Sequence, residues 1–200
     1  MNIAVLPLQQ LCDAAIGAAQ AAGEFIQGVD REKIKQQYKD AGNSSASQLV
    51  TEVDLRSEAI IRERLSDSCA RWDIAFIGEE SSHHPGGELA DRFSKSHFWC
   101  VDPLDGTLPF VEGIPGYAVS IALVERSGTP LIGVVYDPAS GTLLQAIIGL
   151  GAYKNRAALC PMNTVSGTLK VFADASLQAQ GSYENTVRPL NACATDSGLG

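Results

Sequence analysis

Hydrophobic residues near the start of the chain recur at the three- and four-residue spacing of an amphipathic helix. Between about residues 8 and 28 they form one stripe, made of Leu8, Leu11, Cys12, Ala15, Ile16, Ala19, Ala22, Phe25 and Ile26. Gly28 follows the stripe, and helices commonly end at such a glycine. The pattern therefore predicts a helix over residues 8–28 that packs one face against a core.

A second helix is predicted from about Asp54 to Leu65, where Ile60, Ile61 and Leu65 share one side. The charged segment 31–39 precedes it. Residues 41–47 have the small, polar composition of a flexible loop. Asp54 at the helix start would be an ordinary N-cap on this interpretation.

Short apolar runs later in the chain predict β-strands. Two of them, 74–77 and 98–101, come directly before acidic residues. Three longer runs are separated by strong turn signals and predict an antiparallel meander: Tyr117–Val124, Leu131–Tyr136 and Thr142–Ile148. Helices first and strands afterwards indicate an α+β fold.

The segment Asp102-Pro103-Leu104-Asp105-Gly106-Thr107 places two carboxylates three residues apart at a strand end. Pro103 favours a turn, and Asp105 is predicted to cap a helix that begins at Gly106. One interpretation is a turn whose aspartates only cap that helix. The other is a metal-assisted phosphate site, with carboxylates for a hard cation and helix N–H groups for an anion.

Further acids favour the metal interpretation. The run 74–77 leads into Gly78-Glu79-Glu80-Ser81, and Leu49-Val50-Thr51-Glu52-Val53 leads into Asp54. Gathered carboxylates raise one another's pKa and oppose folding, and a bound cation removes that cost. The segment 83–87, with its paired histidines, is predicted to be a surface loop. A zinc site there is not favoured, because no nearby Cys or spaced third ligand accompanies the histidines.

These motifs together resemble the inositol monophosphatase family, the lithium-sensitive, Mg²⁺-dependent phosphatases. The similarity extends over roughly the first 156 residues. It is carried, in order, by Leu49–Asp54, Phe76–Ser81, Trp99–Thr107, Ala118–Leu123, Gly133–Pro138 and Gly149–Tyr153. The resemblance implies a layered α/β/α/β sugar-phosphatase fold.

The resemblance also implies a division of roles among the motif residues. Glu79, Asp102 and the backbone carbonyl of Leu104 would hold one Mg²⁺ ion, and Asp102 and Asp105 would hold another, in a centre of two or three ions. Asp54 and Thr107, with Glu79, would orient the attacking water and accept its proton. Backbone N–H groups of Gly106 and Thr107 would bind the phosphate. Glu80 is interpreted as a solvated neighbour and is not assigned a role.

The chain departs from the family in its later part. Family members have a C-terminal α/β portion with a Trp-Asp pair whose aspartate completes the second metal site. Here both tryptophans, Trp72 and Trp99, precede position 107. We therefore divide the chain into a metal-binding phosphatase domain, 1–156, and an incomplete or divergent start of the C-terminal portion, 157–200. Within the latter, Leu169, Val171 and Phe172 predict one short strand.

Composition limits the partners. The net charge of −8 and the absence of a Lys/Arg-rich run argue against a nucleic acid polymer as partner. Five cysteines without a C-x-x-C motif indicate reduced thiols and a cytoplasmic protein. No secretory signal or membrane span is predicted. The resemblance implies a small phosphorylated substrate and a homodimer.

Four functions stay open at this stage. The first is hydrolysis of a small phosphate monoester, most simply inositol monophosphate. The second is a 3′(2′),5′-bisphosphate nucleotidase, which Leu104 favours, whereas the segment 116–121 favours the first. The third, also within the family, is hydrolysis of fructose 1,6-bisphosphate. The fourth is a non-catalytic relative that uses the metal-binding half for dimerisation or regulation.

Overall fold

The computed structural model describes residues 6–33, 43–82, 94–160, 170–173 and 193–196, and it describes side chains within 6–33, 52–82 and 94–160. The chain divides into two compact units, residues 1–159 and 160–200. Each unit is described by itself. The roles assigned above to residues 1–156 and 157–200 stay predictions.

Helix α1 (Leu8–Gln27) has the bounds that its hydrophobic stripe predicts. The N–H of Gly28 ends the helix by donating to the carbonyls of Glu24 and Phe25, at 3.2 and 3.0 Å. The buried face is rich in alanine, which lets the helix approach the sheet closely. At Gly23 the approach is closest, because a Cβ there would lie 2.5 Å from the ring of Tyr136.

Helix α3 (Asn43–Trp72) begins about eleven residues earlier than its hydrophobic pattern predicts. Residues 43–47, predicted as loop, are helical, and Asp54 lies inside the helix rather than at its N-cap. The N-cap interpretation of Asp54 is therefore wrong. The reason is that periodicity marks only a helix segment with a long apolar stripe, and residues 43–52 are mostly polar. The rest of the predicted loop, 41–42, and the histidine segment 83–87 lie outside the described residues.

Seven strands form one sheet in the order β1-β2-β3-β4-β5-β6-β7. Strand β1 pairs parallel to β2, and all later pairs are antiparallel, so the predicted meander is confirmed. The short strands β6 and β7 were not predicted. The strands are β1 (Ile74–Gly78), β2 (His97–Asp105), β3 (Ala118–Glu125), β4 (Pro130–Asp137), β5 (Thr142–Ile147), β6 (Gly151–Lys154) and β7 (Ala157–Leu159).

The turn after β2 differs from its prediction by one residue. Strand β2 continues through Asp105, and the N-cap of the short helix α5 (Thr107–Glu112) is Gly106, in the left-handed conformation with φ of 85°. Asp105 is therefore not the helix cap. The backbone must reverse sharply between strand and helix, and glycine adopts the required positive φ without steric cost.

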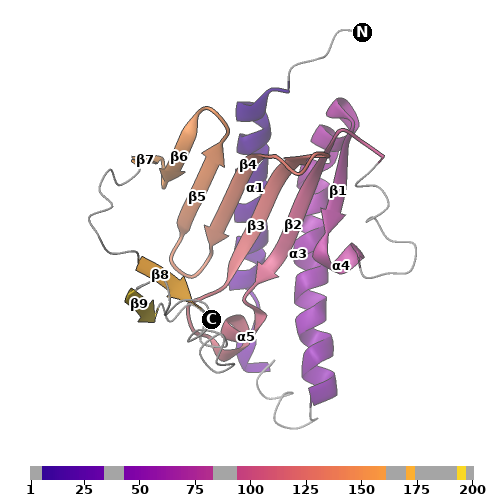
Figure 1. The fold of residues 1–200 in the computed structure, drawn as a ribbon. Coiled ribbons are helices and arrows are strands. Elements are labelled where there is room, and N and C mark those ends of the chain that lie inside the picture. The colour runs from indigo at the N-terminus through magenta and orange to yellow at the C-terminus, as the bar shows by residue number, and fades with distance from the viewer. Residues whose placement is uncertain (1–5, 34–42, 83–93, 161–169, 174–192, 197–200) are drawn as a thin grey trace. The chain divides into compact units, whose positions relative to one another are not determined.

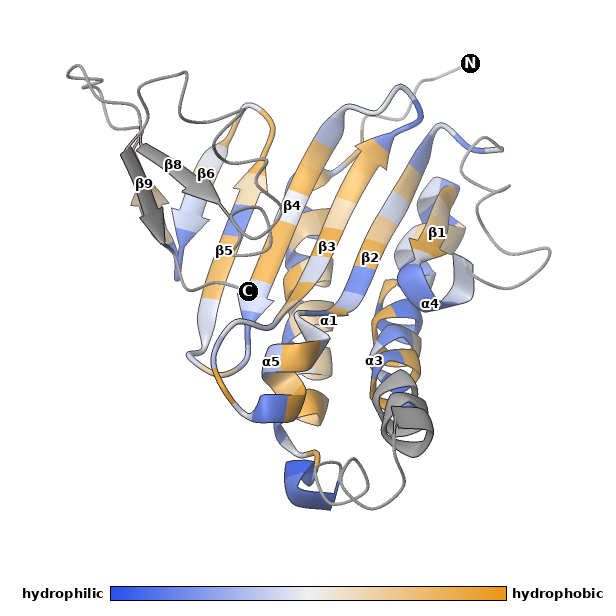
Figure 2. Ribbon diagram, turned by 60° about the horizontal axis from the view of Figure 1, so that its bottom comes forward, coloured by the Kyte–Doolittle hydropathy of each residue, from blue (hydrophilic) through white to orange (hydrophobic). Residues whose placement is uncertain are grey.

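Helices α1 and α3 lie on the same face of the sheet (Figure 1), with α1 against β3, β4 and β5 and α3 against β1 and β2. Apolar residues concentrate where these layers meet (Figure 2). The fully buried Trp99 of β2 lies in this layer, and its indole N–H donates to Ser68 of α3 at 3.0 Å. The helix layer on a mixed sheet confirms the predicted α+β class.

The second unit contains two described strands, β8 (Lys170–Ala173) and β9 (Cys193–Asp196), which pair in parallel. The short strand predicted around Leu169–Phe172 is thus confirmed. Among the helices that the structure describes, none is both long and apolar enough to cross a lipid bilayer.

Candidate metal centre

The parallel pairing of β1 with β2 brings two of the predicted ligands together. Gly78, the last residue of β1, pairs with Val101 in β2. The next residues along the two segments are Glu79, which begins the short helix α4 (Glu79–Ser82), and Asp102. The side chains of Glu79 and Asp102 are hydrogen-bonded to each other. Two motifs more than twenty residues apart in sequence therefore meet at one edge of the sheet.

Asp54 reaches the same place from α3. Its side chain is 6% exposed, and α3 packs against β1, β2 and α4. Burial, followed by the negative charges of Glu80, Glu79 and Asp102, raises the pKa of the Asp54 carboxyl to about 7. These charge interactions indicate that Asp54 lies near the acids that follow β1 and end β2.

Asp102 has a similar environment. Burial, followed by the charges of Glu79 and Asp105, raises the pKa of its carboxyl to about 7. The Leu104 N–H opposes this by donating to Asp102 Oδ1 at 3.1 Å. Asp105, at the end of β2, is exposed to solvent. The two aspartates of the motif therefore differ in solvation although they interact electrostatically.

The turn between β2 and α5 is fixed by contacts on both sides of Gly106. The side chain of Leu104 is buried in the core, and its carbonyl accepts a hydrogen bond from the Thr107 hydroxyl at 3.3 Å. A Cβ at Gly106 would collide with the carbonyl oxygen of Gly116, the residue before Tyr117. Close packing thus leaves no room for any residue except glycine between Asp105 and Thr107.

Two acids near this cluster were not selected from sequence. Glu80 is one of the charges that raise the pKa of Asp54, so it lies within the cluster's field. Glu58 is 4% exposed, and its Oε2 accepts a hydrogen bond from the Glu80 N–H at 2.9 Å. Glu58 follows Asp54 by four residues, a spacing that places both on one helix face. That spacing was the signal that could have identified it.

The cluster fits Mg²⁺ in the kind of donors it offers. All candidate ligands are carboxylate or carbonyl oxygens, which hard divalent cations prefer, and a cation would offset the repulsion among the acids. Within the described part of the chain, no three His, Cys, Asp or Glu side chains are grouped so that they could hold a metal ion as they stand. The fold therefore brings the acids near one another, but in this conformation their side chains are not close enough together to bind one ion.

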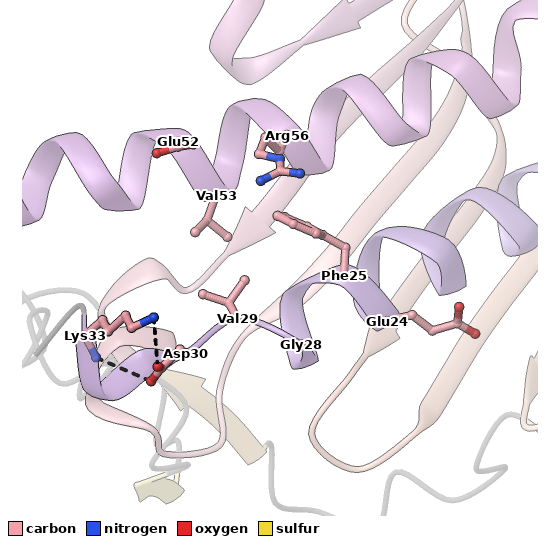
Figure 3. Close-up of a pocket in the computed structure, with 9 residues that line it drawn as sticks. All are labelled: Glu24, Phe25, Gly28, Val29, Asp30, Lys33, Glu52, Val53 and Arg56. Atoms are coloured by element: carbon pink, nitrogen blue, oxygen red, sulfur yellow. Dashed lines mark hydrogen bonds and ion pairs between the residues drawn. The ribbon is translucent and has the colours of Figure 1, made fainter.

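A separate cavity of about 440 Å³ lies between the end of α1 and α3 (Figure 3). Its lining mixes apolar residues with both signs of charge: Glu24, Phe25, Gly28, Val29, Asp30, Lys33, Glu52, Val53 and Arg56. The Arg56 guanidinium lies 5.0 Å from the centre of the Phe25 ring. None of the predicted site residues lines this cavity, so it is distinct from the acid cluster.

The motif residues and the fold agree with a family comparison. The model of the inositol monophosphatase family matches residues 7–191. The chain belongs to the inositol monophosphatase family.

Individual relatives are similar over part of their length. Inositol monophosphatase 2 of Solanum lycopersicum is 38% identical over 151 residues, which are 74% of this chain and 52% of that protein. Histidinol-phosphatase of Chlorobaculum parvum is 41% identical over 106 residues, 53% of this chain and 37% of that protein. The chain spans about half the length of the first curated relatives it matches, or less.

A solved structure has the same fold. Inositol monophosphatase-II from Staphylococcus aureus MSSA476 superposes with a TM-score of 0.66 at 28% sequence identity. The match covers 93% of this chain and 67% of that one. The layered fold implied by the sequence motifs is therefore confirmed.

Proposed function

We propose that this protein is a Mg²⁺-dependent phosphatase that hydrolyses a small phosphate monoester, most simply inositol monophosphate. The observation that carries the proposal is that Asp54, Glu79 and Asp102, from three separate elements, lie near enough to the same end of the sheet for their charges to interact. Membership of the inositol monophosphatase family supports it. So do the names of relatives, which include inositol monophosphatases and a histidinol-phosphatase.

In this proposal the acids divide the work of holding metal. Glu79, Asp102 and the Leu104 carbonyl hold one Mg²⁺ ion, and Asp102 and Asp105 hold a second. Bound Mg²⁺ supplies charge for the phosphate oxygens and lowers the pKa of a coordinated water. The Leu104 carbonyl has a second lone pair, so it can serve as a ligand while it accepts the Thr107 hydrogen bond.

The other residues act on the substrate and on the water. The hydroxyl of Thr107 orients the attacking water, and the carboxylate of Asp54, assisted by Glu79, accepts its proton. The backbone N–H groups of Gly106 and Thr107 donate to the phosphate. Gly106 lies in the left-handed conformation between the end of β2 and the first residue of α5, where helix N–H groups have no partner within the helix.

A second candidate substrate class is a 3′(2′),5′-bisphosphate nucleotide. The observation that favours it is Leu104, the third residue of the Asp102-Pro103-Leu104-Asp105 motif, whose side chain is 2% exposed and directed into the core. The homodimer, the cytoplasmic location and sensitivity to lithium are parts of the same proposal. A non-catalytic relative stays the alternative from a different class.

Phosphate release from a panel of phosphomonoesters, with and without Mg²⁺, tests the proposal. The panel should include inositol monophosphate, histidinol phosphate and a 3′,5′-bisphosphate nucleotide. We expect Mg²⁺-dependent release that is slow for this 200-residue chain, well below the usual kcat range of about 1–10³ s⁻¹, because a second ion held by two carboxylates binds weakly. The proposal would be contradicted if no ester in the panel released phosphate in a way that depends on a divalent cation.

A further inference from the structure

We propose that Glu58 is a positioning residue, which fixes the backbone turn that carries Glu79 and thereby sets the affinity of the centre for Mg²⁺. The part about Mg²⁺ rests on the proposed function. The part about the turn rests on geometry alone, because Glu58 touches the turn directly.

Glu58 is a buried carboxylate with a specific acceptor role. It lies one helical turn after Asp54 on α3 and is 4% exposed. Its Oε2 accepts the backbone N–H of Glu80 at 2.9 Å. Burial of a carboxylate is costly unless hydrogen bonds satisfy it, so a side chain in this environment is held in one place. The hydrogen bond therefore joins α3 to the first turn of α4.

The lack of a side chain at Gly78 makes room for the carboxylate of Glu58. A Cβ at Gly78 would lie no more than 2.5 Å from both carboxylate oxygens of Glu58. Real Cβ atoms do not approach other atoms so closely, hence the carboxylate occupies the space in which a side chain at position 78 would stand. The last residue of β1 is thus in contact with the same group that receives the Glu80 N–H. Glu79 lies between these two anchored residues.

Arg62 supports Glu58 from the next turn of α3. Its Nη2 lies 3.5 Å from Glu58 Oε1 and donates to the Ser81 hydroxyl at 3.1 Å. The guanidinium also lies 4.1 Å from the centre of the Phe76 ring in β1. The Arg62 side chain is 39% exposed, so its ion pair with Glu58 is partly screened by solvent.

The consequence concerns the placement of Glu79. The backbone is held at Gly78 by packing and at Glu80 by a hydrogen bond to Glu58, and Arg62 holds the side-chain hydroxyl of Ser81. A ligand carried on a fixed turn loses less freedom when it binds a cation, and loss of groups that orient a ligand typically weakens metal binding 10–100-fold. For Mg²⁺ affinity, the distance from the Glu58 carboxyl to the Glu80 N–H should therefore be more important than the charge of that carboxyl.

Two substitutions separate reach from charge. Glu58→Gln keeps the length and an acceptor oxygen but removes the charge. Glu58→Asp keeps the charge but withdraws the carboxylate by one methylene. Glu63→Ala removes an exposed acid from the same helix and is the matched control. Both Glu58 variants keep a polar group of similar size at the site, so folding should survive in each.

The first measurement is amide hydrogen exchange at Glu80, by NMR on the complete metal-free chain. We expect protection in wild type, Glu58→Gln and Glu63→Ala, and rapid exchange in Glu58→Asp. The second is Mg²⁺ affinity by calorimetry, where Glu58→Asp should bind about 10–100-fold more weakly and the other variants close to wild type.

The outcomes are distinguishable. Protection at Glu80 that survives Glu58→Asp would overturn the inference whether or not Mg²⁺ binds. Lost protection with unchanged Mg²⁺ affinity would also overturn it, since Glu58 would then be only structural. A wild-type chain that binds no Mg²⁺ would overturn the proposed function and with it the metal part of the inference, whereas exchange at Glu80 would still decide the part about the turn.

Discussion

The guanidinium of Arg31 donates a 2.6 Å hydrogen bond to the hydroxyl of Tyr117, 86 residues further along the chain. Its Cζ also lies 5.1 Å from the ring centre of Phe110 and 5.2 Å from that of Tyr117. The two rings meet edge to face at 5.5 Å. This contact joins the segment after α1 to α5 and to the residue before β3, so it braces the turn that follows the acidic motif.

Replacement of either partner should reduce stability. Tyr117→Phe removes only the hydrogen bond and should lower the free energy of unfolding by about 1 kcal/mol. Arg31→Ala removes the ring contacts as well and should lower it by about 2 kcal/mol, because a cation over an aromatic face adds roughly 0.5–2 kcal/mol. Urea denaturation measures both, with the exposed Lys154→Ala as control. A double variant whose loss equals the sum of the two single losses would show that the residues are not coupled.

Gly106 should tolerate substitution less well than another glycine of similar conformation. Both Gly106 and Gly128 have positive φ, 85° and 97°, but a Cβ at Gly128 meets nothing within 4 Å. Gly128→Ala should therefore cost only the left-handed strain, about 1–2 kcal/mol. Gly106→Ala adds the collision with the Gly116 carbonyl and should cost more. Equal losses in thermal or urea unfolding would show that the collision is relieved without penalty.

Millimolar Mg²⁺ should raise the melting temperature of the wild-type chain, because a ligand that binds only the folded state stabilises it by mass action. Mn²⁺ should act similarly and Ca²⁺ more weakly. Asp102→Asn removes a charge that Glu79 and Asp105 repel. The metal-free variant should thus be at least as stable as wild type, while its response to Mg²⁺ should be lost.

Differential scanning fluorimetry of the wild type and of Asp102→Asn, with and without each cation, measures the melting temperatures. Asp67→Asn, an exposed acid on α3, is the control for a general loss of one charge. Equal Mg²⁺ affinity in wild type and Asp102→Asn would rule out Asp102 as a ligand.

Cys12 should be inert to alkylating reagents at neutral pH. Burial, and secondarily the charge of Asp13, raises the pKa of its thiol to about 11, and the thiolate is the reactive form. The exposed Cys100 should be alkylated first. Iodoacetamide labelling followed by peptide mass spectrometry compares the two sites. Labelling of Cys12 at the rate of Cys100 in the folded chain would contradict this.

The same shift predicts a direction for stability. The folded state holds the Cys12 proton more tightly than the unfolded chain, in which a thiol has a pKa near 8.5. The stabilisation is therefore complete below about pH 8.5 and is lost as the pH rises toward about 11. Cys12→Ala should show a smaller fall in stability over that range than wild type.

Local patterns in the sequence determined the elements that bury a continuous apolar stripe or run. Helix α1 and strands β3, β4 and β5 have nearly the predicted bounds. Their hydrophobic pattern and the turn residues that end them lie within a few positions of each other in the sequence. The acidic motifs around Glu79 and Asp102 could also be identified from the sequence, since acidic residues directly follow apolar runs there.

Tertiary structure alone decided how those motifs combine. The early start of α3 puts Asp54 inside a helix, and packing of that helix on β1 and β2 brings Asp54 to the strand ends. The contact of Glu58 with Gly78 and Glu80, and that of Gly106 with Gly116, join residues ten to twenty-two positions apart. Such contacts depend on how close two backbones approach, and that distance is set by the packing of whole elements rather than by the residues on either side.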